Sequence, residues 1–163
     1  MHTGPNPNDR AERGLKRRIA TDADGTPLVV LVGPANRRDE QPVGPLLWLL
    51  YAALLAAGLR RPAAVQADRG YGFPWTIALV RAWGIRPLIA PRGSPHGSGL
   101  GRTRYVVERT HAWFARFRRL VQCYERRPGH AQGFHALAAC VICARRLRAG
   151  RPRRGRAAAA RAA

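Results

Sequence analysis

Acidic residues are scarce in this 163-residue sequence, and lysine is almost absent. Nine aspartates and glutamates stand against 29 basic residues, Lys16 is the only lysine, and the formal net charge is +20. Such a charge repels basic partners and concentrates polyanions at the protein surface. An acidic membrane would instead favour basic residues on one face of an amphipathic helix or beside a hydrophobic anchor. Here arginine is spread along the whole chain, which favours nucleic acid.

The sequence also has no hydrophobic run long enough to cross a bilayer and no export signal. Its longest apolar run, residues 46–57, is shorter than the roughly 20 residues that a membrane-spanning helix requires. The N-terminus is polar and punctuated by proline, without the apolar segment of a signal peptide. We therefore expect a cytoplasmic, nucleoid-associated protein with no membrane partner.

Cysteine is scarce as well, with three residues, Cys123, Cys140 and Cys143. The CVIC spacing of the last two occurs in zinc and redox sites. However, a zinc site needs four ligands, and a thioredoxin-like site needs different flanking residues. Both cysteines lie in an apolar helical stretch, ALAACVICARRL, where cysteine is an ordinary small core residue. We interpret this pair as structural.

Two β-prone runs, residues 18–21 and 27–32, are separated by Asp-Ala-Asp-Gly, a turn signal that predicts a β-hairpin. The pattern beyond it predicts a helix, a strand, a helix, a strand and two further helices. Their residues are 46–57 (closed by Gly58), 63–67, 74–83 (closed by Gly84), 85–91, 104–121 and 131–148.

The length suits one globular domain with tails. We expect an extended arm over residues 1–14, a domain over residues 15–148 and a basic, disordered tail over residues 149–163. Residues 145–163 contain eight arginines and no acidic residue. This composition favours disorder and binding to nucleic acid.

Two of the scarce carboxylates are notable for their positions. Asp68 follows the predicted strand 63–67, at its C-terminal edge. Glu108 lies on the predicted helix 104–121, opposite an apolar stripe when successive residues are placed about 100° apart. The stripe consists of Val106, Thr110, Trp113, Phe117 and Val121. The neighbours of Glu108 on the open face are Arg104, His111, Ala112, Ala115 and Arg119.

Each carboxylate also has a simpler interpretation. Asp-Arg-Gly is favourable turn chemistry, and Glu108 can be a solvated helix residue with arginine partners. Alternatively, two carboxylates brought together from a strand end and a helix could hold Mg²⁺, which activates water in phosphodiester cleavage. Arginines around them would then bind the DNA backbone. The residues alone leave both interpretations open.

Most of the chain, from Thr3 to Leu147, carries a series of stretches in the order found in one family. They are TGPNPNDR, KRRIATDADGTPLVV, PANRRDE, QADRGY, GIRPLIAPRG, GSGLGRTRYVVERTHAWFARFRRL, YERR and LAACVICARRL. Together they resemble the C-terminal catalytic part of a bacterial DDE insertion-sequence transposase with a ribonuclease-H-like fold. The resemblance implies an α/β fold with a mixed sheet and flanking helices. It also implies DNA cleavage and strand transfer at transposon ends, with Mg²⁺ or Mn²⁺ as cofactor.

The resemblance assigns roles to individual residues. Asp68 matches the second catalytic aspartate and Glu108 the catalytic glutamate, so both are expected to be metal ligands. A tyrosine and a lysine of the family signature are replaced by Gly101 and Ala115, but arginines lie next to both places. The expected DNA-binding residues are Arg69, Arg92, Arg102, Arg104, Arg116 and Arg119.

The first catalytic aspartate of the family lies on a strand upstream of the GPNP segment. Asp9, Asp22, Asp24 and Asp39 all match non-catalytic parts of the family. We therefore expect an N-terminally truncated domain that is incomplete alone, either a genomic remnant or a second-frame product that pairs with an upstream-frame product. The alternatives are a non-catalytic DNA-binding protein, an inhibitor of a related transposase, or a chain that does not fold stably. A homo-oligomer is compatible with each folded form.

Overall fold

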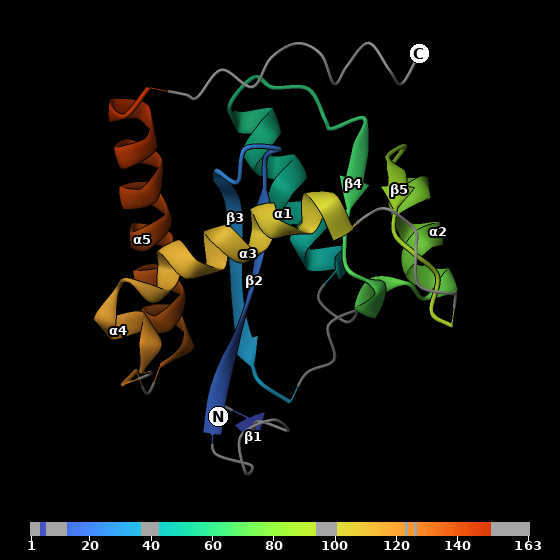
Figure 1. Ribbon diagram of the computed structural model, residues 1–163. Coiled ribbons are helices and arrows are strands. Elements are labelled where there is room, and N and C mark those ends of the chain that lie inside the picture. Colours follow the sequence, from blue (N-terminus) through green and yellow to red (C-terminus); the bar gives the residue numbers. More distant parts are fainter. Residues whose placement is uncertain are drawn as a thin grey trace.

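The computed structural model describes residues 4–5, 13–36, 43–93, 101–122, 124–125 and 127–150. These residues form two small β-sheets with helices around them (Figure 1). One sheet has the strand order β1-β2-β3 and is antiparallel, and the other is the parallel pair β4-β5. The expected α/β class is confirmed. Within the described residues the two sheets share no strand pairing, so the single mixed sheet of the expected ribonuclease-H-like fold is not formed.

The predicted hairpin is present and is longer than expected. Its strands, β2 (Arg13–Thr21) and β3 (Pro27–Pro34), pair antiparallel with Arg18 opposite Leu31. Alternate residues of a strand point to opposite faces. The hairpin therefore offers one face to α1 and the other to α3 and α5, all of which contact it.

Local chemistry closes the hairpin turn as the sequence predicts. The Asp22 Oδ1 atom accepts hydrogen bonds from the backbone N–H groups of Asp24 and Thr26, at 2.9 and 2.7 Å. Gly25 has a φ of +80°, in the left-handed region that glycine adopts without a steric penalty. Asp22 is thus occupied as a turn residue, in agreement with its non-catalytic assignment.

The short strand β1 (Gly4–Pro5) extends the hairpin sheet, with its residues opposite Gly14 and Arg13. Two residues of the predicted arm are therefore paired with β2. The rest of the arm up to residue 12, and residues 151–163 of the predicted tail, lie outside the described residues. The domain boundaries stay predictions.

The second sheet is a parallel βαβ unit. Strands β4 (Ala64–Gln66) and β5 (Arg86–Leu88) are joined through helix α2 (Pro74–Ala82), as parallel strands require a crossover. Both the order and the positions of these elements agree with the sequence pattern. The left-handed Gly84, with a φ of +67°, ends α2 as predicted.

Helix α1 (Val43–Ala56) packs against this unit and against the hairpin. The first core consists of Val43, Leu47, Val80, Ile85 and Ile89. Gly58 follows the helix with a φ of +65°, as the predicted cap. No helix in the described part of the chain is long and apolar enough to cross a membrane.

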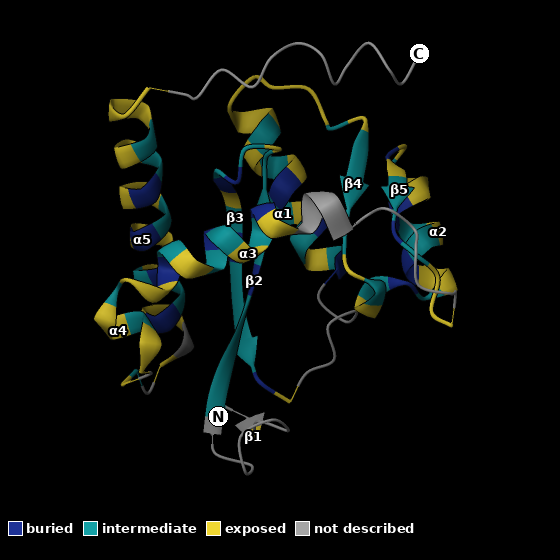
Figure 2. Ribbon diagram, viewed as in Figure 1, coloured by how far each residue is buried: buried dark blue, intermediate teal, exposed yellow. Residues whose placement is uncertain are grey.

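A second core lies between the hairpin and the C-terminal helices α3 (Gly101–Ala115), α4 (Arg118–Val121) and α5 (Pro128–Arg148). It consists of Val30, Phe114, Ala138 and Ile142. Figure 2 shows that the buried residues of α5 lie on the side facing β3 and the exposed ones on the other side. The helix begins three residues before the predicted position 131.

Gln132 fixes α5 to strand β3. Its Nε2 atom donates to the Val30 carbonyl oxygen at 2.8 Å, and its Oε1 atom accepts from the Val32 N–H at 3.0 Å. The side-chain amide thus satisfies one backbone donor and one acceptor of the strand, groups that are costly to leave unpaired where they are buried.

The helix predicted over residues 104–121 is interrupted. Phe117 has extended backbone angles, φ −90° and ψ 103°, between the end of α3 and the start of α4. The interruption resets the helical phase, so Val121 is 69% exposed and its place in the apolar stripe was wrong. Val106 and Thr110 are buried as predicted, while the fully buried aromatic ring is that of Phe114.

Candidate functional site

Asp68 lies just beyond the C-terminal end of β4, at the edge of the parallel pair. It caps the 3₁₀ helix η1 (Arg69–Tyr71), with its Oδ1 atom accepting from the Arg69 N–H at 2.6 Å. The residue is exposed. The carboxyl ends of parallel strands are where α/β proteins commonly bind ligands. The turn role and a functional role are therefore compatible, because one carboxylate oxygen forms the cap bond and Asp68 still reaches solvent.

The segment around Asp68 is tightly packed against the end of β5. The Arg92 N–H donates to the Gly72 carbonyl oxygen at 3.0 Å. A Cβ atom at position 72 would lie only 2.2 Å from the Ala90 carbonyl oxygen, so this close approach requires glycine. The Arg92 guanidinium lies 4.6 Å from the centre of the Phe73 ring. Two predicted DNA-binding arginines, Arg69 and Arg92, thus follow the two strand ends.

Glu108 lies on the exposed face of α3, as predicted, together with Ala112 and Ala115. Other sides of α3 are fixed to the hairpin tip. There the Thr110 hydroxyl donates to the Gly25 carbonyl oxygen at 2.7 Å, and the Arg109 Nη2 atom donates to the Asp24 carbonyl oxygen at 2.7 Å. These two bonds set the rotation of α3 and direct Glu108 away from the core.

The remaining predicted arginines differ in their surroundings. Arg116 is exposed at the interruption between α3 and α4. The side chains of Arg102 and Arg104, in the first turns of α3, lie outside the described residues. Arg119 is exposed but already paired: its Nε and Nη2 atoms lie 2.9 and 2.7 Å from Glu125 Oε1, and its guanidinium lies 4.4 Å from the Phe134 ring centre.

Sequence reasoning missed Glu125 as the partner of Arg119. The side chain of Glu125 is only 12% exposed, and its Oε2 atom also lies 3.8 Å from His130 Nδ1. The pair spans six residues across the turn between α4 and α5, a separation that no helical periodicity indicates. The YERR stretch was the available signal, because it places an acidic residue among basic ones.

A buried cation next to two histidines was also missed. Burial lowers the pKa of Arg17, whose guanidinium lies 4.9 Å from the Phe114 ring centre. Burial, and secondly the charge of Arg17, lower the pKa of His111. Burial and Arg17 also lower that of His135, although the bond to the Ala131 carbonyl oxygen opposes this. The structure thus places His111, which was expected on the open face of the helix beside Glu108, in a half-buried position near Arg17.

The described residues do not form a complete metal site. Carboxylates are ligands that Mg²⁺ prefers, and Asp68 and Glu108 supply two of them from separate elements. Within the described part of the chain, however, no group of three or more His, Cys, Asp or Glu side chains is placed to hold a metal ion. Cys140 and Cys143 are free thiols on α5. Cys143 is half-buried, with its Sγ atom 3.6 Å from the Pro27 carbonyl oxygen, but Cys140 is exposed, so its interpretation as a core residue was wrong.

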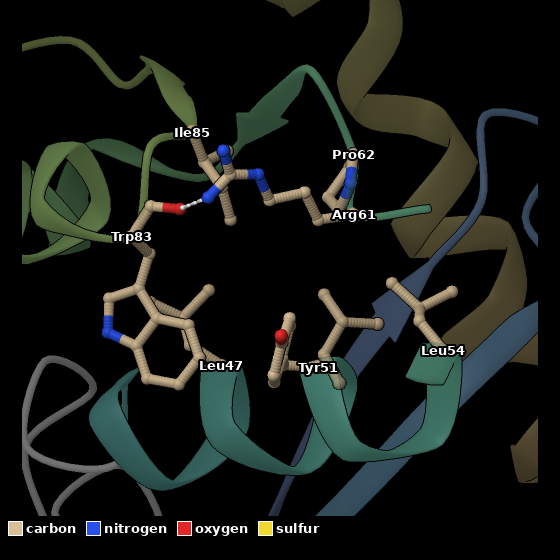
Figure 3. Close-up of a pocket in the computed structure, with 8 residues that line it drawn as sticks. Leu47, Tyr51, Leu54, Arg61, Pro62, Trp83 and Ile85 are labelled. Atoms are coloured by element: carbon tan, nitrogen blue, oxygen red, sulfur yellow. Dashed lines mark hydrogen bonds between the residues drawn. The ribbon is translucent and has the colours of Figure 1, made fainter. Parts of the chain in front are cut away.

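A small pocket between α1 and the loop that follows α2 is not a candidate site. Its lining is largely apolar and includes Leu47, Tyr51 and Trp83 (Figure 3). The charged group there, Arg61, already donates from Nη1 to the Trp83 carbonyl oxygen at 2.9 Å. The Tyr51 and Trp83 rings pack edge to face, 5.7 Å apart. The pocket is a packing feature of the first core.

The sequence is similar to known proteins. The family model of the transposase DDE domain matches residues 1–143. The chain is 47% identical over 148 residues to a Burkholderia cepacia protein named "Putative transposase for insertion sequence element IS402", and the match spans 90% of this chain and 70% of that protein. No solved structure matches the chain. The chain belongs to the transposase DDE domain family. The resemblance seen in the sequence is thereby confirmed, and the family supports a function in DNA transposition.

Proposed function

We propose that the chain takes part in DNA cleavage and strand transfer at transposon ends, with Asp68 and Glu108 as its catalytic carboxylates. The observation that carries this proposal is the position of Asp68 at the C-terminal edge of the parallel pair, within a chain matched by the transposase DDE domain model. Glu108 supports it as an exposed carboxylate on a helix whose rotation the hairpin tip sets.

The divalent cation implied by the family resemblance, Mg²⁺ or Mn²⁺, would take Asp68 and Glu108 as ligands together with at least one further group. Among the described residues no group of three or more His, Cys, Asp or Glu side chains is placed to hold a metal ion. A second copy of the chain or an upstream-frame product is the proposed source of the further ligand. These partners are part of the proposal, as is the association of the protein with the nucleoid.

DNA is the proposed substrate, bound by arginines around the carboxylates. Arg69 and Arg92 follow the ends of β4 and β5, and Arg116 is exposed after α3. The same role is proposed for Arg102 and Arg104. Arg119 can contact DNA only if it gives up part of its pairing with Glu125, so we expect its contribution to be the smallest.

The test uses the full chain together with the upstream-frame product, and a supercoiled plasmid that carries the DNA flanking the reading frame, including any terminal inverted repeats. We expect nicking in Mg²⁺ or Mn²⁺ that is lost in Glu108→Gln and Asp68→Asn, while both variants keep wild-type DNA affinity. Asp24→Asn is the matched control, because it makes the same carboxylate-to-amide change in the hairpin turn, where the bonds described above use the backbone groups of Asp24. Full nicking by Glu108→Gln would refute the assignment.

A non-catalytic DNA-binding protein, or an inhibitor of a related transposase, is the second candidate. The observation that favours it is that the described residues contain no group of three potential metal ligands. It predicts no nicking by the wild-type chain in either metal, even with the upstream-frame product present. It also predicts DNA binding that falls steeply with salt and shows little sequence preference. Inhibition of a related transposase by equimolar chain would separate the inhibitor from a simple binder.

A further inference from the structure

Helices α3 and α5 carry a row of arginines stacked on aromatic rings. Two guanidinium groups lie over the Trp113 ring, with Arg109 at 5.3 Å and Arg146 at 4.9 Å from the ring centre. Arg109 also lies 5.5 Å from the Tyr105 ring centre. We call the set the stacked arginine surface, and it consists of Tyr105, Arg109, Trp113, Phe117, Arg145 and Arg146, with Arg145 lying 5.8 Å from the Phe117 ring centre.

The guanidinium groups of this surface are held without carboxylates. Arg146 Nε donates to Thr26 Oγ1 at 3.2 Å, and Arg109 Nη2 donates to the Asp24 carbonyl oxygen at 2.7 Å. Within the described residues, no acidic partner is found for Arg109, Arg145 or Arg146. This differs from Arg119, whose charge is paired with Glu125. The positive charge of the stacked arginine surface is therefore available to an external anion.

Stacking on a ring leaves the edges of a guanidinium group able to donate hydrogen bonds. Arginine has five N–H donors in a planar fork that matches phosphate geometry, and stacking reduces the conformational freedom lost on binding. Arg145 is exposed, and Arg146 is half-buried with its Nη atoms outside the bond to Thr26. Both have donors left for an incoming phosphate.

The position of this surface suits an extended polyanion. Residues 105, 109 and 113 are four apart and form one row along α3, while Glu108 lies one residue, about 100°, to the side of it. The row continues onto the last turn of α5, where Arg145, Arg146 and Arg148 are clustered. Beyond residue 150 the sequence adds five more arginines and no acidic residue.

We infer that the stacked arginine surface binds the phosphate backbone of duplex DNA, as a second contact beside the region of Asp68 and Glu108. The inference deepens the proposed function by locating a DNA contact on α3 and α5, and it rests on DNA being the substrate. Backbone contacts of this kind position a duplex without reading its sequence.

The experiment measures binding of the full chain to a fluorescein-labelled duplex of arbitrary sequence, by anisotropy over a series of salt concentrations without divalent metal. The test variant is Arg145→Gln with Arg146→Gln. The matched control is Arg60→Gln with Arg86→Gln, which removes the same charge from exposed positions next to β4 and in β5. In Figure 1, β5 lies on the opposite side of the molecule from α5.

Losing two phosphate contacts should reduce the slope of log affinity against log salt by about 1.8. The ratio of the DNA affinity of the wild type to that of the test variant should then fall about 12-fold between roughly 50 and 200 mM salt. The control pair should change the slope by less than half as much. Equal changes in both pairs would mean that only overall charge matters and would overturn the inference, as would an unchanged slope in the test variant.

Two further measurements separate stacking from charge and DNA from lipid. Arg145→Lys with Arg146→Lys keeps the charge but loses the stacked fork, so wild-type affinity in this variant would overturn the role given to stacking. If the double glutamine variant lost binding to vesicles of anionic lipid while its DNA binding stayed unchanged, the surface would be assigned to membranes instead.

If the double glutamine variant does not fold, Arg145→Gln alone should lower the slope by about 0.9. Because no metal is present, a failed nicking assay leaves this result intact.

Discussion

Replacing Thr110 with valine removes a buried hydroxyl while keeping the shape of the side chain. Thr110 is completely buried in α3, and its Oγ1 atom donates to the Gly25 carbonyl oxygen at 2.7 Å, with the Val106 carbonyl oxygen at 3.0 Å. Thr110→Val leaves the Gly25 carbonyl oxygen without this donor in a region closed to water. The expected loss is about 1–3 kcal/mol in the free energy of unfolding.

Thr76→Val is the matched comparison for this change. Thr76 is also completely buried in a helix, α2, but its Oγ1 atom has no hydrogen-bond partner within the described residues. A methyl group in place of an unsatisfied buried hydroxyl should be neutral or stabilising. Both substitutions replace threonine with valine inside a helix, so differences in helix propensity nearly cancel.

Urea titration and thermal melting of the full chain measure both effects. At about 2–4 °C per kcal/mol for a chain of this size, Thr110→Val should lower the melting temperature by roughly 2–12 °C. Thr76→Val should leave the melting temperature unchanged or raise it. Equal losses in the two variants, or a wild-type melting temperature in Thr110→Val, would refute the view that the bond to Gly25 fixes α3 to the hairpin tip.

Three other predictions concern separate parts of the molecule. Gly72→Ala should cost about 1–3 kcal/mol in thermal melts, because its Cβ would lie 2.2 Å from a backbone oxygen, whereas Gly70→Ala meets open space and should melt like the wild type. His135 has a lowered pKa in the folded state, so its contribution to stability is present above about pH 6.5 and is lost as the pH falls toward that lowered value. Between about pH 7 and 5 the urea midpoint should decrease less in His135→Gln than in the wild type. An equal decrease in the two proteins would contradict this. Exposed Cys140 should react with iodoacetamide faster than Cys143, whose pKa burial raises, and mass spectrometry showing the reverse order would count against the packing of α5.

Features set by a few neighbouring residues could be predicted from the sequence. The hairpin follows from Asp22 and Gly25, because the turn is closed by their own side-chain and backbone chemistry. Gly58 and Gly84 marked helix ends because a left-handed residue is needed there. The place of Asp68 at a strand end could be predicted for the same reason, since a short apolar run stops at a turn.

Features that depend on distant residues could not be predicted. The helical spacing of apolar residues continues through Phe117, so nothing local marks the interruption before α4. Gln132 binds β3 across 100 residues of sequence, and a polar residue on a helix surface gives no sign of such a role. For the candidate site, the roles of Asp68 and Glu108 stay predictions, while the pairing of Arg119 with Glu125 required the three-dimensional arrangement.

The contacts between the hairpin tip and α5 affect how long the hairpin stays uncovered while the protein is synthesised. The tip residue Thr26 is bonded to Arg146, which is added to the growing chain 120 residues later. At about 5–20 residues per second, this interval lasts roughly 6–24 s. Until residues 138 and 142 are added near its end, the hairpin lacks the part of α5 that covers Val30. The nascent chain therefore exposes an apolar strand pair for most of its synthesis, the type of surface that chaperones bind and that aggregates when they are limiting.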